Sequence, residues 1–350
     1  MSRSSTRSTL VPLAVIALVL VGSAAAFAYT AGWLSPERLT ASRLVAALAP
    51  PGGPALGHRR NHAKGICFTG EFRSNGNGVA LSKAKVFTAG AWPVLGRFNL
   101  ATPSPNAADA TVRVRGMGLQ ITTPDGAVWR SAMIDAPVFA VSTPLAFYDL
   151  LESAPKGPEA MKAFIGRHPE FVAFAGWAGS APWTSSYAED PFNSLNSFLF
   201  TDAAGTTRAV RWSLRPAATP VPIKPEELAK KGPNYLEQEI AQRVAGAPQR
   251  WTMEVTVAEP GDNTADPTRT WPQGRRTIEV GTLVVNKVIA EPDGPCRDIN
   301  FDPTILPRGA SVSDDPFPAA RSSAYARSYD LRTSEAKDYP RTPVAGSAKP

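Results

Sequence analysis

The sequence predicts an α+β fold built around a closed antiparallel β-barrel, and three observations predict it. Eight β-rich runs recur along the body of the 350-residue chain. Helical segments are inserted between these runs and do not alternate with them regularly. Pro and Gly are frequent, with 34 and 27 residues, which favours strands and loops over a helical bundle. A closed barrel is the natural way to protect so many strand edges.

The composition is that of a globular chain, and it excludes several classes of protein. Hydrophobic residues make up 43% and charged residues 19% of the sequence, which argues against wholesale disorder and against a polytopic membrane protein. Two cysteines and three histidines are too few for a disulfide scaffold, a four-cysteine zinc site or a His-rich metal centre. The net charge of +7 comes from scattered Lys and Arg residues without a recognisable nucleic-acid module, so no nucleic-acid partner is expected.

An uncharged segment near the N-terminus predicts a membrane anchor. The stretch from Leu10 to Tyr29 carries no charge and matches the ~20 residues needed to cross a bilayer. Arg3 and Arg7 precede it, so the rest of the chain should lie outside the cytoplasm, in the periplasm. The small-residue run at 24–26 also resembles a cleavage site, which leaves a cleaved signal and a secreted product as the alternative. We assign residues 1–30 to this segment.

The body of the chain contains the strands and helices of the predicted barrel. A helix is expected from Ser35 to Leu48, because Ser35 can cap it and Pro36 suits its first position. Turn signals such as Pro-Asp-Gly at 124–126 separate the strands, and the polar segment 333–350 is predicted to be disordered. The expected strands are Ile66–Phe72, Val112–Ile121, Val128–Ile134, Val138–Val141, Ser197–Thr201, Arg208–Leu214, Trp251–Val257 and Ile278–Ile289. The further expected helices are Pro144–Glu152, Gly157–Phe164, Pro169–Ala178 and Lys224–Val244.

Single residues say little about the chemistry. His62 stands just before a predicted strand, and a lone His is more often structural than catalytic. Arg321 and Tyr325 are four residues apart and share a face if the segment is helical, which an ordinary surface pair also does. Export would permit Cys67 and Cys296 to form a disulfide, while two free buried thiols remain open as well.

Taken together and in order, several segments resemble the catalase superfamily. Arg-Arg-Asn-His-Ala-Lys-Gly at 59–65 is similar to the family's distal-histidine segment, and Gly-Arg-Phe-Asn at 96–99 to a segment that supplies a propionate-binding Arg. Asp-Ala-Pro-Val-Phe at 135–139 resembles the family's Asn-Thr-Pro-Val-Phe. Arg-Ser-Ser-Ala-Tyr at 321–325 has the spacing of the helix that carries the tyrosinate haem ligand. The resemblance covers residues 56–332.

The resemblance implies a haem b protein, with the haem buried between the barrel and a C-terminal Tyr-bearing helix in a domain of residues 31–332. Tyr325 would be the iron ligand, with its phenolate stabilised by Arg321. His62 and Asp135 would be the catalytic residues of the distal pocket. The remaining implied haem contacts are a stacking ring at Phe147 and propionate-binding guanidinium groups at Arg59, Arg97 and Arg332.

The sequence also departs from full-sized catalases. It ends soon after the ligand helix, which points to the small subgroup called catalase-related peroxidases. The distal Asn is replaced by Asp135, the Ser that supports the distal His by Asn99, and the acidic channel position falls on Arg113 or Val114. A carboxylate beside His62 should hold the imidazole in its charged form or become protonated itself. We therefore expect weak or absent dismutation of hydrogen peroxide, and a larger catalase share after Asp135→Asn.

The predicted function is reduction of hydrogen peroxide and organic hydroperoxides with electrons from a small organic donor. Neutral His62 would take a proton from the peroxide and return it to the leaving oxygen. Two other functions remain open. A non-enzymatic haem carrier would share Tyr325 but has no need for His62, and an allene-oxide-synthase-like enzyme would rearrange fatty-acid hydroperoxides in the same pocket. A monomer or a small homo-oligomer is expected.

Overall fold

The computed structural model describes residues 7–33, 35 and 38–341, and the chain divides into two compact units, residues 1–40 and 41–350. The first unit contains helix α1 (Arg7–Thr30). Its residues Val11–Thr30 are the one stretch in the described part of the chain that is long and apolar enough to cross a membrane. The expected uncharged segment is thus helical and fits either a membrane span or a signal sequence. Arg3 lies outside the described residues.

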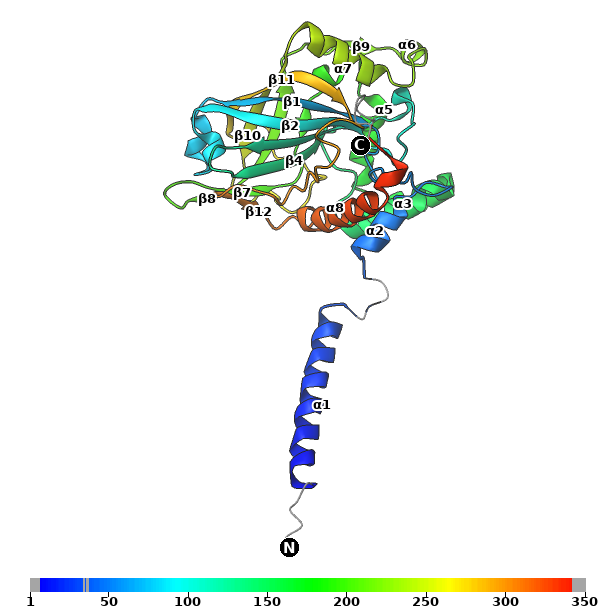
Figure 1. The fold of residues 1–350 in the computed structure, drawn as a ribbon, viewed down its shortest axis with the longest axis vertical. Coiled ribbons are helices and arrows are strands. Elements are labelled where there is room, and N and C mark those ends of the chain that lie inside the picture. Colours follow the sequence, from blue (N-terminus) through cyan, green and yellow to red (C-terminus); the bar gives the residue numbers. More distant parts are fainter. Residues whose placement is uncertain (1–6, 34, 36–37, 342–350) are drawn as a thin grey trace, which may run out of the picture. The chain divides into compact units, whose positions relative to one another are not determined.

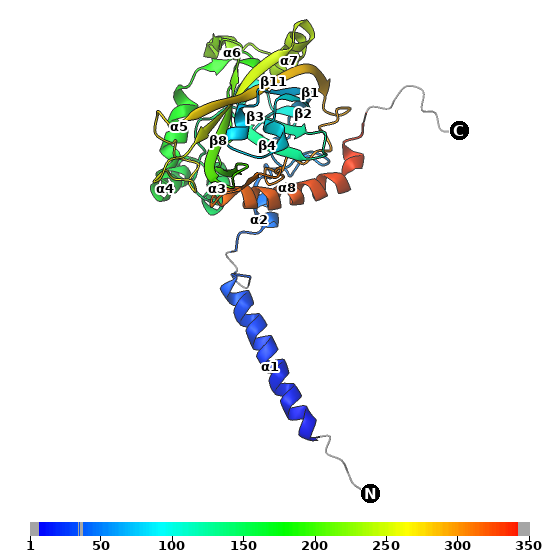
Figure 2. The ribbon, with the colours of Figure 1, turned by 90° about the vertical axis from the view of Figure 1, so that its left-hand side faces the viewer.

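The second unit is built on a closed ring of eight antiparallel strands (Figures 1 and 2). In pairing order they are β10 (Gln249–Val257), β11 (Thr277–Ala290), β1 (Gly65–Ser74), β2 (Gly90–Leu100), β3 (Arg115–Thr122), β4 (Val128–Ile134), β6 (Phe192–Asn193) and β8 (Thr207–Pro216). β8 pairs again with β10 and closes the barrel. Four short strands are β7 (Phe198–Thr201) and β12 (Ala310–Val312), which extend the sheet from β8, and β5 (Trp183–Thr184) and β9 (Pro222–Ile223), which pair separately. The predicted α+β barrel is confirmed.

Side chains fill the interior of this barrel. In β10 every second residue is buried from Trp251 to Val257, as a strand with one face in the core requires. The Phe98 ring centroid lies 5.1 Å from that of Tyr187 and 5.7 Å from that of Trp251. A barrel of this size is a packed core and not a pore, so space for a ligand must come from what packs against its outside.

Helices provide that outer layer. α8 runs along the outside of the barrel beside α2 (Figure 1), and α2 contacts both α8 and α3. The helices are α2 (Ala41–Ala47), α3 (Pro144–Ser153), α4 (Pro158–Arg167), α5 (Phe171–Ser180), α6 (Pro225–Leu228), α7 (Tyr235–Gly246) and α8 (Phe317–Ser334). Single 3₁₀ turns are η1 (Asn77–Ala80), η2 (Lys85–Phe87), η3 (Asp109–Thr111), η4 (Ala154–Lys156), η5 (Tyr187–Glu189) and η6 (Ala336–Asp338).

Two expected helices differ from the observed ones. α2 begins at Ala41 and not at Ser35, since residues 35 and 38–40 are not helical and residues 36 and 37 lie outside the described ones. The single helix expected at 224–244 is two helices, α6 and α7. Gly232-Pro233 separates them, because a proline disfavours helical backbone in the residue before it.

The strand predictions miss two strands of the barrel, β2 and the two-residue β6, and add a false one. Val138–Val141 is not a strand, and Phe139 there donates its backbone N–H to Pro267 O in an irregular segment that follows Pro137. β2 was absent from the predicted set although it pairs on both sides. Pro93 and two glycines lower its β-propensity, but Pro93 stands before the pairing with β3 begins at Val94, so β3 does not require its missing N–H.

The predicted C-terminal tail is partly ordered. α8 continues to Ser334, and Glu335 accepts a hydrogen bond from the Arg60 guanidinium at 2.5 Å. Tyr339 stacks on the His58 ring, with 3.9 Å between the ring centroids. Residues 342–350 lie outside the described ones. The ordered chain thus extends at least nine residues beyond Arg332, to Arg341.

Candidate active site

A cavity of about 590 Å³ lies between the barrel and the helices α2, α3 and α8. Strands β3 and β4 contribute Met117 and Met133 to its wall, and α2 contributes Leu44 and Val45. Most of its lining is apolar, so the polar side chains that reach the cavity are the candidates for a chemical role. Of the predicted site residues, those that line the cavity are Arg59, His62, Arg97, Phe147, Arg321, Tyr325 and Arg332.

His62 enters the cavity from the segment that leads into β1. Its backbone has φ 55°, a left-handed conformation that is uncommon for a residue other than glycine. Its Nδ1 lies 2.6 Å from Asn99 Oδ1. Asn99 donates its amide N–H to Arg97 O at 3.3 Å, so the amide oxygen faces the imidazole. Nδ1 therefore carries the proton, and Nε2 is left as an acceptor.

The environment of His62 favours its neutral form. Burial lowers the pKa of His62 to about 4, against the ordinary 6.5. The Asn99 hydrogen bond opposes this shift, while the positive charges of Arg97, Arg321 and Arg59 add to it. At neutral pH the imidazole is thus uncharged and able to accept a proton at Nε2.

Two glycines allow the close packing around His62. A Cβ on Gly116 of β3 would stand 2.5 Å from Asn99 Oδ1, the atom that holds the imidazole. A Cβ on Gly65 would stand 2.7 Å from the guanidinium carbon of Arg97. Glycine inside a strand often marks such a close approach, and here both positions serve the site.

Tyr325 enters the cavity from α8. Arg321, one helical turn earlier, donates a hydrogen bond from Nη2 to the Tyr325 hydroxyl oxygen at 3.1 Å. Arg321 is itself fixed, since it donates to Asn196 Oδ1 at 2.7 Å and to Ala132 O at 2.8 Å. Asn196 in turn donates to the buried Asp315 at 2.9 Å. The phenol oxygen therefore faces the cavity with a fixed cation beside it.

Three arginines and one carboxylate form a cluster at another part of the cavity wall. Arg97 is bound by the Glu291 carboxylate through Nε at 2.7 Å and Nη2 at 2.6 Å. Arg59 Nε lies 3.6 Å from Glu291 and has no hydrogen-bond acceptor within the described chain. Burial would raise the pKa of Glu291, but Arg97, Arg59 and Arg332 together hold it below its usual range. We call these four residues the arginine cluster.

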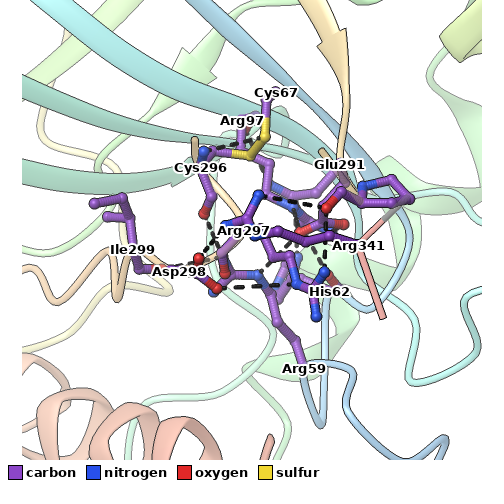
Figure 3. The surroundings of a disulfide bond; sticks show 12 residues. Arg59, His62, Cys67, Arg97, Glu291, Cys296, Arg297, Asp298, Ile299 and Arg341 are labelled. Carbon is purple, nitrogen blue, oxygen red and sulfur yellow. Dashed lines mark hydrogen bonds and ion pairs between the residues drawn. A yellow bond between two sulfur atoms is a disulfide. The ribbon is translucent and has the colours of Figure 1, made fainter. Parts of the chain in front are cut away.

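The segment after β11 holds this cluster in place (Figure 3). Arg59 Nη2 donates to the carbonyl oxygens of Cys296 and Ile299, each at 3.0 Å. Arg332 donates to the carbonyls of Arg297 and Ile299. Cys296 forms a disulfide with Cys67 of β1, with 5.4 Å between their Cα atoms. The two cysteines, whose pairing the sequence left open, thus form a disulfide. This bond attaches the segment that orients the arginines to the barrel.

Phe147 and Asp135 have different positions relative to the cavity. Phe147 of α3 lines it and packs against Phe139, with 5.5 Å between ring centroids. Asp135 is not among the described residues that line the cavity. Its carboxylate accepts a hydrogen bond from the Arg115 backbone N–H at 2.9 Å and from Arg113 Nη1 at 3.3 Å. Its catalytic role stays a prediction, and the expected contact with His62 is not seen.

A sequence comparison identifies the family. The family model described as Catalase matches residues 54–347, which contain the whole barrel, α8 and all of the predicted site residues that line the cavity. The chain belongs to the catalase family. Its resemblance to the small catalase-related peroxidases is confirmed by two relatives of that name.

These relatives match this catalase-family chain over nearly its whole length. The catalase-related peroxidase of Synechococcus elongatus is 32% identical over 91% of this chain and 96% of its own. That of Mycolicibacterium paratuberculosis is 31% identical over 84% of this chain and 95% of its own. Among solved structures, catalase A from Saccharomyces cerevisiae has a TM-score of 0.70 at 20% identity, over 79% of this chain and 61% of its own. That likeness shows the shared fold, and this chain spans about three fifths of the larger catalase.

The arginine cluster fits the haem that the resemblance implies. Its three guanidinium groups and the Glu291 carboxylate leave a net charge of +2, which two propionates would offset. The unpaired Nε of Arg59 and the phenol oxygen of Tyr325 supply a free donor and a ligand atom. Glu291 was not predicted, because one acidic residue at a strand end has no local signature.

Proposed function

We propose that this catalase-family protein is a haem b peroxidase that reduces hydrogen peroxide and organic hydroperoxides with electrons from a small organic donor. The observation that carries the proposal is that one cavity is lined by a neutral imidazole with an acceptor Nε2 and by a phenol held by an arginine. The names of the two relatives agree with this activity.

Different residues of the cavity would hold the iron, the propionates and the porphyrin ring of the haem. Tyr325 would ligate the iron, since the Arg321 guanidinium at 3.1 Å stabilises a phenolate. Arg59, Arg97 and Arg332 would bind the propionates, and the Phe147 ring would stack on the porphyrin. When bound, haem iron supplies the redox chemistry of O–O bond cleavage.

In the proposed reaction, His62 transfers the proton. Its Nε2 takes the proton from the peroxide O–H and delivers it to the oxygen that leaves as water or as an alcohol. Asn99 holds the ring through Nδ1, so the same nitrogen performs both transfers. The donor then supplies the two electrons and two protons that complete the reduction. Dismutation is expected to be weak, because Arg113 and the Arg115 backbone N–H hold the side chain at position 135 outside the cavity lining, where it cannot orient a second peroxide.

The N-terminal helix and the disulfide support an extracytoplasmic location. A span at Val11–Thr30 with a basic flank would anchor residues 41–341 outside the cytoplasm, and cleavage would release them. A disulfide persists in such an oxidising compartment. Mass spectrometry of the mature N-terminus distinguishes a membrane anchor from a cleaved signal sequence. A C-terminal fusion reporter tests on which side of the membrane the second unit lies.

The function is tested with the full chain purified in detergent. We expect a tyrosinate-type haem spectrum, and oxidation of a phenolic donor with hydrogen peroxide or an alkyl hydroperoxide that exceeds oxygen release. Haem without turnover would establish the carrier, and a rearranged epoxide in place of an alcohol would establish the allene-oxide-synthase-like reaction. A protein that takes up no haem overturns the proposal.

A further inference from the structure

A second hollow of about 430 Å³, the vestibule, adjoins the cavity. Ala101, Pro103, Val114 and Phe174 line both spaces. The chain between β2 and β3 forms one side of the vestibule, and α5 forms another. The vestibule and the cavity therefore share part of their wall.

The vestibule is apolar apart from two threonines and one cation. α5 has the sequence Phe-Val-Ala-Phe-Ala-Gly-Trp-Ala-Gly-Ser, without a charged residue. Among the described residues that line the vestibule, Arg113 carries the only charge. An apolar pocket with one charged group orients a ligand that has one complementary charge and an apolar body.

Arg113 is half-buried and makes few hydrogen bonds within the described chain. Its one hydrogen bond in the described chain goes from Nη1 to Asp135 Oδ2 at 3.3 Å, and its buried Nε has no acceptor. By contrast, the terminal nitrogens of the neighbouring Arg115 donate four hydrogen bonds, two of them to Thr184 and one to Asp190.

The surroundings of Arg113 fix its guanidinium and leave its charge incompletely offset. The guanidinium carbon lies 4.1 Å from the Trp177 ring centroid and 5.2 Å from that of Trp183, so two aromatic rings hold the group in place. Burial and the nearby Asp190 raise the pKa of Asp135 to about 7. Near neutral pH its carboxylate is thus only partly ionised.

We propose that the vestibule binds organic hydroperoxides whose apolar body ends in a carboxylate, and that Arg113 receives this carboxylate. The proposal rests on the peroxidase function and names its substrate class. A guanidinium presents paired N–H donors that match a carboxylate, and the walls formed by Val112, Phe174 and Ala178 would contact the hydrocarbon.

The position of the vestibule favours a hydroperoxide over an electron donor as its occupant. Thr102, a vestibule residue, accepts a hydrogen bond at its carbonyl from Ala63 N at 2.8 Å, next to His62. Ala101 stands two residues after Asn99, which holds the imidazole. The hydroperoxide O–O bond would break in the cavity, beside His62. One alcohol and one water form, and two molecules of a phenolic donor each supply one electron and one proton.

The experiment compares a carboxylate substrate with its ester. Full-length protein in detergent is assayed with 13-hydroperoxyoctadecadienoic acid and with its methyl ester, per haem, with a phenolic donor. We expect the ratio of kcat/KM for the acid to that for the ester to fall about tenfold in Arg113→Gln. Arg113→Lys should recover part of the ratio. Arg215→Gln, an arginine on β8 paired with Glu254, is the matched control and should keep the wild-type ratio.

The ratio cancels folding yield and haem loading within each variant. Its comparison between variants in the same detergent also cancels the different partition of acid and ester. Linoleic acid, which has no peroxide, should also inhibit the wild type more strongly than Arg113→Gln. An unchanged acid-to-ester ratio in Arg113→Gln overturns the inference while leaving the peroxidase intact. A wild type that turns over neither substrate nor hydrogen peroxide overturns the proposed function itself.

Discussion

His62 and Tyr325 line the same cavity, but the chain positions them by different means. His62 lies in a left-handed backbone turn at the entry to β1, and Asn99 of β2 binds its ring. Tyr325 lies in a regular helix, where the four-residue spacing alone brings Arg321 beside it. On both sides an asparagine sets the orientation, since Asn196 binds Arg321 as Asn99 binds His62.

The difference between the two sides matches the roles proposed for them. A proton-transfer group must keep one tautomer and one nitrogen in place, which a strand-bound amide and a fixed backbone provide. A ligand oxygen needs a cation close to it, which a helical turn supplies without special backbone geometry. The barrel side should therefore control the rate of peroxide cleavage, and the α8 side should control haem binding.

Removal of the phenol oxygen has the largest expected effect. Tyr325→Phe should lose haem or bind it at least 100-fold more weakly, because Phe offers no ligand atom. Arg321→Leu keeps the oxygen and should retain haem with a shifted spectrum. Haem titration followed by absorbance measures both. A native haem spectrum in Tyr325→Phe would show that another residue is the ligand.

Removal of the imidazole should separate binding from chemistry. His62→Ala should bind haem as the wild type does and slow peroxide cleavage by about 10²- to 10⁴-fold, the range for a general acid–base group. Stopped-flow mixing with hydrogen peroxide measures the step. A rate within threefold of the wild type would contradict the assignment of the proton to His62.

The pH dependence of cleavage reports directly on the environment of His62. Its lowered pKa of about 4 keeps the imidazole neutral above that value. Acidification from pH 8 to pH 5 should therefore change the rate less than twofold, with the loss coming near pH 4. An unshifted histidine would be half protonated at pH 6.5 and would lose half of its rate there. A midpoint near 6.5 in the measured profile would show that burial does not control this group.

The sequence predicts the chemically distinctive part of the site better than its supporting contacts. Arg, His, Phe and Tyr residues at ordered spacings identify seven cavity residues, because each segment carries a local pattern. Glu291 has no such pattern, and its contact with Arg97 depends on β1 pairing with both β2 and β11. The barrel is predicted from the β-rich runs, but β2 is not, because Pro93 and two glycines lower its β-propensity. Its pairing tolerates Pro93, since β3 pairs with β2 only from Val94 onward.

Asp135 shows the limit of a local motif. The motif places its backbone after β4 correctly, but the direction of the side chain depends on Arg113 and Arg115, which lie across the β3–β4 pair. A carboxylate expected beside the imidazole is instead bound to a guanidinium of the vestibule. The residues that raise or lower the pKa of His62 most are accordingly Asn99 and the arginines, not Asp135.

The smallest expected effect follows from that placement. If the Asp135 side chain does not reach the distal pocket, Asp135→Asn should change neither the pH midpoint of peroxide cleavage nor, by more than about twofold, the ratio of oxygen release to donor oxidation. An asparagine can still accept the Arg115 N–H hydrogen bond, so the fold should be preserved. Oxygen-electrode and donor-oxidation assays across pH 5 to 8 measure both quantities, with His62→Ala as the reference for a residue that does act on peroxide. A rise in the catalase share would contradict this prediction, because it would show that haem binding turns the Asp135 carboxylate toward His62. The His62 side of the cavity would then depend on haem binding, and so on the Tyr325 side, more than their separate supporting residues indicate.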